Sequence, residues 1–156
     1  MRIDDLIDFI DGLGNVLTLR PAPGDGSPEI SWGDVFFFYA PDGVMPRTQP
    51  FATIVTKDYP DDRESRLDRP GAFRLNVAAG TDEFRRRIGR APRELKTEQV
   101  DHSETDVLFA HPVYGELGWL AVVLPGDRTE PVVRELLRTA HGRARGRLER
   151  RTEATN

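Results

Sequence analysis

Apolar residues recur at helical spacing at both ends of the chain. The N-terminal stripe consists of Ile3, Leu6, Ile7, Ile10 and Leu13. The C-terminal stripe consists of Val133, Leu136, Leu137, Ala140, Ala144 and Leu148. Residues three and four apart share one face of a helix, so each stripe predicts an amphipathic helix that packs on a core. Gly12 and Gly14 predict the end of the first helix.

Between these two helices the pattern changes to that of β-strands. Residues 35–39 are five apolar residues in a row, which predicts a strand covered on both faces. Polar and apolar residues alternate along 72–77, which places Arg74 and Asn76 on one face of a strand and the apolar residues on the other. Thr81, followed by two acidic residues, predicts the start of another helix. The predicted strands are 15–19, 35–39, 51–57, 72–77 and 117–124.

The order of these elements predicts the fold class. A helix, several strands, a helix, a strand and a long helix indicate a single α+β domain. We expect an antiparallel sheet of five to six strands, with the N- and C-terminal helices packed on one face. Residues 89–106 are polar and without periodicity, so they predict a surface excursion. The domain is expected to span 1–150, with a disordered tail at 151–156.

Charge is distributed unevenly along the sequence. Residues 1–62 carry a formal charge of −7 and residues 63–156 one of +3, and the chain as a whole carries −4. There is no cysteine, which excludes disulfides and thiolate chemistry. Four aspartates interrupt the N-terminal apolar residues, and no apolar run approaches the roughly 18 residues of a membrane span. We therefore expect a cytoplasmic protein without a membrane association.

The common catalytic motifs are missing from the sequence. It has no GxxxxGK[ST], no GxGxxG after a strand, no HExxH and no GxSxG. These absences indicate no particular reaction, and no cofactor is predicted. A divalent metal held by His102, Asp106 and His111 is conceivable from the residue types, but their spacing matches no ligand pattern, so we predict no metal.

The stretch "HPVYGELGW" suggests a pocket. A histidine before proline is held extended at the entrance to a strand, with its ring free to face a cleft. "SWGD" stands at the corresponding start of another strand. If both strand starts face the same end of the sheet, one apolar, aromatic pocket with an acid and a base results. Its predicted lining residues are Trp32, Asp34, His111, Tyr114 and Trp119.

Three functions are compatible with these features. The leading hypothesis is a module that binds a small molecule or a peptide in the aromatic pocket. An enzyme is an alternative, with His111 as general base and Asp34 orienting it. A nucleic-acid-binding module is another, in which phosphates contact the arginine-rich C-terminal helix. Its predicted contacts are Arg138, Arg143, Arg145 and Arg147. A homodimer formed through an exposed sheet face is also possible.

Much of the chain resembles an uncharacterised family of actinobacterial proteins. The resemblance is carried by "SWGDVFFFYAPDGV", "QPFATIVTKDYP", "SRLDRPGAFRLNV" and "HPVYGELGWLAVVLPG". It implies no catalytic residue.

The end of the chain is similar to the end of the MmcQ/YjbR-like proteins. The similarity lies in the strand "GWLAVVL" followed by the helix "TEPVVRELLRTAHGRA". It implies a frataxin-like α+β fold, which has been likened to a double-winged DNA-binding shape. This implied fold agrees with the one predicted from the pattern, and it keeps nucleic acid among the alternatives.

Overall fold

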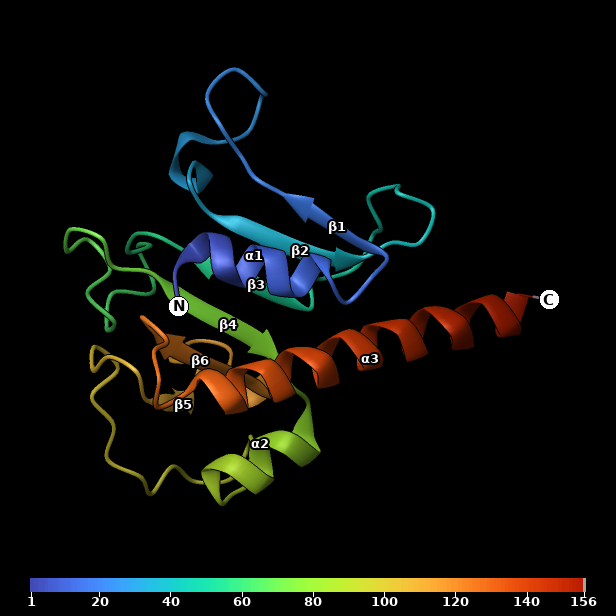
Figure 1. Ribbon diagram of the computed structural model, residues 1–156. Helices are drawn as coiled ribbons and strands as arrows, with labels where there is room; N and C mark the ends of the chain where they lie inside the picture. The colour runs from blue at the N-terminus through green and yellow to red at the C-terminus, as the bar shows by residue number, and fades with distance from the viewer. Residues whose placement is uncertain (156) are drawn as a thin grey trace.

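The computed structural model describes residues 1–155 and contains one antiparallel sheet of six strands with three α-helices (Figure 1). The strand order is β1-β2-β3-β4-β6-β5, and every neighbouring pair is antiparallel. The predicted α+β class is confirmed. The strands are β1 (Val16–Leu19), β2 (Val35–Tyr39), β3 (Ala52–Val55), β4 (Arg74–Ala78), β5 (Leu108–Ala110) and β6 (Trp119–Val123). The helices are α1 (Ile3–Asp11), α2 (Thr81–Ile88) and α3 (Glu130–Thr155), with short 3₁₀ turns η1 (Glu29–Ser31) and η2 (Gly115–Leu117).

One face of the sheet carries the main core. The apolar stripes of α1 and α3 pack on alternate residues of the central strands, so the N- and C-terminal helices cover the same face, as predicted. Leu6, Leu137, Ile54 and Leu75 are fully buried in this layer. Burying such side chains contributes roughly 1.5–3 kcal/mol each, which makes this layer the main source of stability.

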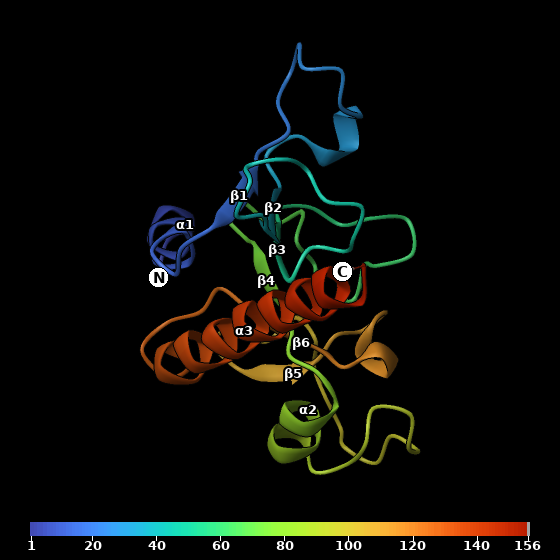
Figure 2. The same cartoon turned by 90° about the vertical axis from the view of Figure 1, so that its right-hand side faces the viewer.

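Within residues 1–155, no α-helix covers the opposite face of the sheet, which is covered in part by loops. Figure 2 shows the short turns η1 and η2 on the side of the sheet away from α1. Leu67, Ala72 and Phe109 form part of a small second apolar cluster there, beside the polar side chains of β4. Because loops rather than a helix cover this face, it has room for a hollow.

α3 projects beyond the sheet at its C-terminal end (Figure 1). Its buried residues end near Ala140, and Figure 1 shows its C-terminal half extending past the strands. The helix continues to Thr155, through most of the segment for which a tail is predicted. An Arg145–Glu149 pair at helical spacing supports the turn that precedes this segment. Residue 156 lies outside the described part of the chain. None of the helices in residues 1–155 is long and apolar enough to cross a lipid bilayer.

Candidate functional site

A cavity of about 540 Å³ lies on the face of the sheet that carries no helix. Its floor is formed by β3 and β4, and its walls come from η1, from Gln49 and Pro50, from the loop after β3 and from 111–119. Phe36 of β2 also lines it, so five stretches of the sequence meet around one hollow. The volume is within the range of about 300–1,000 Å³ that is usual for small-molecule sites.

The polar floor follows from the alternation of residues along β4. Leu75 and Val77 point into the main core, so Arg74 and Asn76 point to the other face, where they line the cavity. Asn76 lies opposite Thr53 of β3 and donates a hydrogen bond to its hydroxyl, Nδ2 to Oγ1, over 3.0 Å.

Arg74 is almost completely buried, with 1% of its surface exposed. Asp62 accepts two hydrogen bonds from its guanidinium, from Nη1 at 3.0 Å and from Nη2 at 2.5 Å. Nε donates to Asn76 Oδ1 at 2.7 Å, Nη1 to Ser65 Oγ at 3.0 Å, and Nη2 lies 3.1 Å from His111 Nε2. Four of the five N–H groups of the guanidinium therefore donate to oxygen atoms of the protein, and the fifth, on Nη2, faces the His111 ring. The floor of the cavity is therefore a paired charge rather than a free cation.

Asp62 supplies the negative charge of this pair. Burial acts to raise its pKa, but the hydrogen bonds and charge of Arg74 outweigh burial and lower the pKa below the ordinary value. Asp62 thus stays ionised at neutral pH and compensates the buried guanidinium.

His111 is buried at one end of the floor. Its Nδ1 accepts hydrogen bonds from the backbone N–H groups of Val113, at 3.1 Å, and Tyr114, at 3.0 Å, while Nε2 faces Arg74. Burial above all, together with the charge of Arg74, lowers the pKa of His111 to about 3. The ring is therefore neutral near pH 7 and a weak base. Since Nδ1 is also occupied, the geometry argues against His111 as a general base.

An aromatic wall rises from His111 toward the solvent. The ring centroids of His111 and Tyr114 are 5.0 Å apart, and those of Tyr114 and Trp119 are 6.5 Å apart. Tyr114 is 48% exposed and Leu117 is 64% exposed, so the rim of the cavity presents apolar surface to water. Gly118 makes this arrangement possible, because its φ of +86° turns the chain from η2 into β6.

The structure brings together three of the five residues predicted for the pocket. His111, Tyr114 and Trp119 line the cavity, whereas Trp32 and Asp34 are not among the described residues that line it. Asp34 does not orient His111. Its carboxylate instead accepts hydrogen bonds from the N–H and hydroxyl of Thr56, at 2.8 and 2.9 Å, and from Lys57 Nζ at 2.8 Å.

The hydroxyl of Tyr59 also donates to Asp34, and Tyr59 does line the cavity. Burial first, and then this carboxylate, raise the pKa of Tyr59 above its usual value, so the phenol stays protonated. Lys57 Nζ donates as well to the carbonyl of Trp32, at 2.8 Å. Asp34 therefore anchors a lining residue, Tyr59, from outside the cavity, and Trp32 is connected to Asp34 through Lys57.

The side chains proposed for a metal or for nucleic acid are also dispersed. Asp106 is not a free ligand, because it accepts hydrogen bonds from the N–H groups of Gly126, Arg128 and Thr129 just before α3. Within residues 1–155, no three histidine, aspartate or glutamate side chains gather as a metal site.

The four arginines predicted for nucleic acid lie on different faces of α3. Arg138 stacks over the ring of Phe9, 5.3 Å from its centroid, and Arg145 pairs with Glu149 at 2.9 Å. Arg143 and Arg147 face the other way, toward the sheet, where both line a smaller cavity. The four side chains therefore do not form one continuous surface.

The cavity also contains polar residues that the sequence hypothesis did not include. Arg74, Asn76, Asp62 and Tyr59 all line it. The alternation along 72–77 was a usable signal, because it placed Arg74 and Asn76 on the face opposite the apolar residues. No local pattern marks Asp62 or Tyr59, which reach the site from an irregular loop.

Comparisons with known proteins identify a family but no activity. The model of DUF6194, described as a family of unknown function, matches residues 1–153. No curated protein matches the chain, and no solved structure matches it.

Proposed function

We propose that this chain, which belongs to the DUF6194 family of unknown function, is a module that binds a small, largely apolar molecule. The observation that carries the proposal is the cavity of about 540 Å³ on the open face of the sheet. Apolar and aromatic walls around a few placed polar groups are the usual composition of a small-molecule site.

The exposed apolar residues favour a ligand over a purely structural hollow. Of the large hydrophobic side chains that are exposed, Ile30, Val113, Tyr114 and Leu117 all lie on this one rim. Clustered exposure of apolar surface marks interaction sites in soluble proteins. A ligand that covers these side chains removes that surface from water.

The polar floor favours binding over catalysis. Arg74 and Asp62 neutralise each other, and the pKa of about 3 keeps His111 neutral. The floor therefore offers hydrogen-bonding edges to a ligand without an activated nucleophile or base. The acidic side chain of Asp61, also in the lining, adds a polar edge near the mouth.

Binding of the neutral fluorophore N-phenyl-1-naphthylamine tests the proposal. Its emission rises in an apolar site, and we expect saturable binding to the wild-type protein. Val113→Glu places a charge on the cavity rim and is expected to weaken binding about tenfold, because a carboxylate must then be desolvated beside the ligand.

Val44→Glu is the matched control, since Val44 is 64% exposed and lies in a loop outside the cavity. Both variants change an exposed valine into a glutamate, so effects of net charge cancel. Absence of saturable binding to the wild type, or equal affinities in the two variants, would rule out this cavity as the site.

A further inference from the structure

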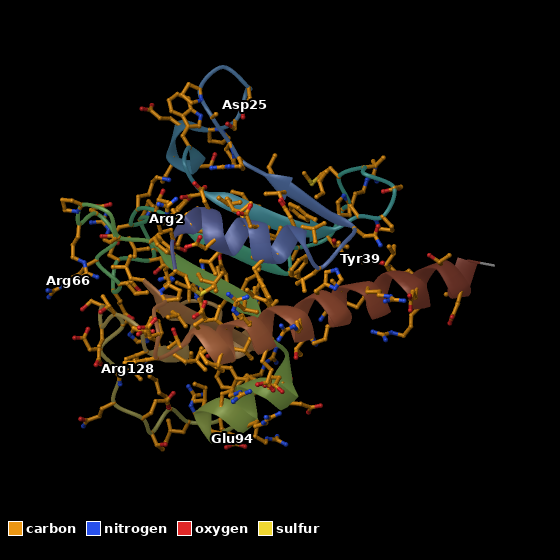
Figure 3. All side chains as sticks on the ribbon, viewed as in Figure 1. Arg2, Asp25, Tyr39, Arg66, Glu94 and Arg128 are labelled. Carbon is orange, nitrogen blue, oxygen red and sulfur yellow. The ribbon has the colours of Figure 1, made fainter. Side chains whose placement is uncertain are left out.

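A second, smaller cavity of about 260 Å³ adjoins the first. It lies between the C-terminal half of α3 and residues 48–51 at the end of the sheet. Figure 3 shows Tyr39, one of its lining residues, at the end of β2 beside α3. The ring centroids of Tyr39 and His141 are 5.2 Å apart. The two cavities share the lining residues Gln49, Pro50, Leu117 and Trp119.

No buried layer separates the two cavities. Gln49 and Leu117 are exposed, and Pro50 and Trp119 are half-buried. An elongated molecule can therefore lie across these four side chains and occupy both hollows at once.

The smaller cavity is lined by arginines at a four-residue spacing. Arg143, Arg147 and Arg151 share one face of α3, as residues four apart in a helix do. Arg143 Nη1 donates to the carbonyl oxygen of Ala78 at 2.9 Å, which fixes its guanidinium at the back of the cavity. Three cations from one helix thus line one side of the hollow.

Two other arginines of α3 differ from these three in having acidic partners. Arg134 pairs with Glu130 and Arg145 with Glu149, each at 2.9 Å. Among the residues that the structure describes, no carboxylate forms an ion pair with any of the three arginines that line the smaller cavity. Burial first, and then repulsion by the charge of Arg147, lower the pKa of Arg143, although the charge of Asp82 acts in the opposite direction. An anion placed there relieves this repulsion.

The larger cavity has the opposite electrostatic character. Its charged lining residues are Asp61, Asp62 and Arg74, and the arginine is already paired with Asp62. An anionic group is therefore disfavoured at that end and favoured at the arginines.

We infer that the ligand is an amphipathic organic anion. Its apolar body lies in the larger cavity, and its carboxylate, phosphate or sulfonate group is held by Arg143, Arg147 and Arg151 in the smaller one. This inference rests on the proposed function and assigns the chemical class and the orientation of the ligand.

Two matched fluorophores test the inference. N-phenyl-1-naphthylamine is neutral, and 8-anilinonaphthalene-1-sulfonate has the same ring skeleton with a sulfonate added. We expect the wild-type protein to bind the sulfonate about tenfold more tightly, the scale of one charge-assisted hydrogen bond. The double variant Arg147→Gln/Arg151→Gln should reduce the affinity for the sulfonate to that for the neutral compound, whose own affinity should not change.

The double variant Arg138→Gln/Arg145→Gln is the control, because it removes two charges from the same helix on another face. It should keep the preference for the sulfonate. Equal affinities for the two fluorophores in the wild type, or equal losses in the two double variants, would overturn the inference while leaving the proposed function intact. Failure of both fluorophores to bind would instead remove the proposed function itself.

A short DNA duplex serves as a competitor in the same titration. Displacement of the sulfonate by the duplex, with the neutral fluorophore still bound, would assign the arginines to nucleic acid and overturn the inference. We expect no displacement, because the arginines line a hollow of about 260 Å³ rather than an extended surface, and the chain carries a net charge of −4.

Discussion

Arg74 lies in the floor of the proposed site, and its hydrogen-bond and charge partners determine its role there. A buried cation is tolerated only when its charge is paired and its N–H groups are satisfied. Asp62 meets the first condition, and together with Asn76 and Ser65 it accepts four of the five N–H groups. The guanidinium thus joins β4, the loop that carries Asp62, and the turn at His111, and it positions the floor of the cavity rather than serving as a free anion site.

Replacement of Arg74 by methionine should be strongly destabilising. The substitution leaves the carboxylate of Asp62 without its partner, and breaking a buried pair in this way costs about 3–5 kcal/mol. The double variant Arg74→Met/Asp62→Asn removes both charges and should be at least as stable as Arg74→Met alone. Urea denaturation followed by tryptophan fluorescence measures the free energies of unfolding of the wild type, of Arg74→Met, of Asp62→Asn and of the double variant. If the destabilisations of Arg74→Met and Asp62→Asn simply add in the double variant, the two groups are not coupled and the assignment of the pair is wrong.

For single residues, the sequence indicates the face of a strand on which a side chain lies more readily than the residues with which it forms hydrogen bonds. The alternation along β4 indicated which face Arg74 occupies, but the partner Asp62 comes from an irregular loop whose course no pattern fixes. The predicted convergence of Asp34 with His111 was wrong for a related reason. Gly33, at a φ of +88°, turns the chain between Trp32 and Asp34, and the carboxylate meets Thr56 and Lys57 on the neighbouring segment.

Among the elements, α3 performs two tasks in different parts of its length. Its first half buries Val133, Leu136 and Leu137 in the main core, and its second half presents arginines beside the smaller cavity. Gly142 lies between the two halves, where a Cβ would meet nothing within 4 Å. A glycine inside a helix lowers its stability relative to alanine without any compensating contact here.

Gly142→Ala is therefore expected to stabilise the protein by about 0.5–1 kcal/mol. Gly118→Ala is the opposing control and should destabilise it by at least about 1 kcal/mol. At Gly118 the φ of +86° disfavours a side chain, and a Cβ would lie only 3.2 Å from the carbonyl carbon of Gly80. Thermal unfolding of both variants beside the wild type checks the two signs. A destabilised Gly142→Ala variant would mean that the helix needs its flexibility at this position.

Long and short elements differ in how clearly their residue patterns predict them. Long periodic segments such as α1 and α3 were recognisable because many residues repeat one signal. β5 was not assigned from the sequence, since its three residues, Leu108–Ala110, are too few to establish an alternation. The turn η2 was expected only as a bent loop, and the position of Tyr114 and Leu117 on the rim depends on its conformation.

At the scale of the whole molecule, the cavity results from an asymmetry of the fold. The two amphipathic helices at the chain ends both pack on one face of the sheet, and the loops that cover the other face do not fill it. The apolar patterns predicted the first layer, because hydrophobic stripes must be buried. They could not predict the hollow, since its shape depends on loop conformations that are set by contacts between distant residues.

The burial of His111 in this site should make the stability of the whole domain depend on pH. The pKa of His111 is lowered from 6.5 to about 3 in the folded protein, chiefly by burial. Between these values the unfolded chain binds a proton that the folded chain does not, so stability rises with pH. The full stability of the folded state is present above about pH 6.5, where His111 is neutral in both states. It decreases as the pH falls toward 3, because only the unfolded chain then takes up this proton.

One proton corresponds to about 1.4 kcal/mol per pH unit, which sets the upper limit of the slope that His111 contributes. His111→Asn removes the titrating group, while its Oδ1 can still accept the N–H groups of Val113 and Tyr114 in the turn. Urea unfolding at several pH values between 7 and 5 should give a free energy that falls toward acid in the wild type and falls less steeply in His111→Asn. His102→Gln serves as a comparison, because burial also lowers the pKa of His102. His102 should therefore make a second contribution of the same sign to the dependence of stability on pH. Equal slopes in His111→Asn and the wild type would mean that His111 accepts a proton in the folded state. The floor of the cavity would then carry a second cation beside Arg74, and its charge would no longer be balanced by Asp62 alone.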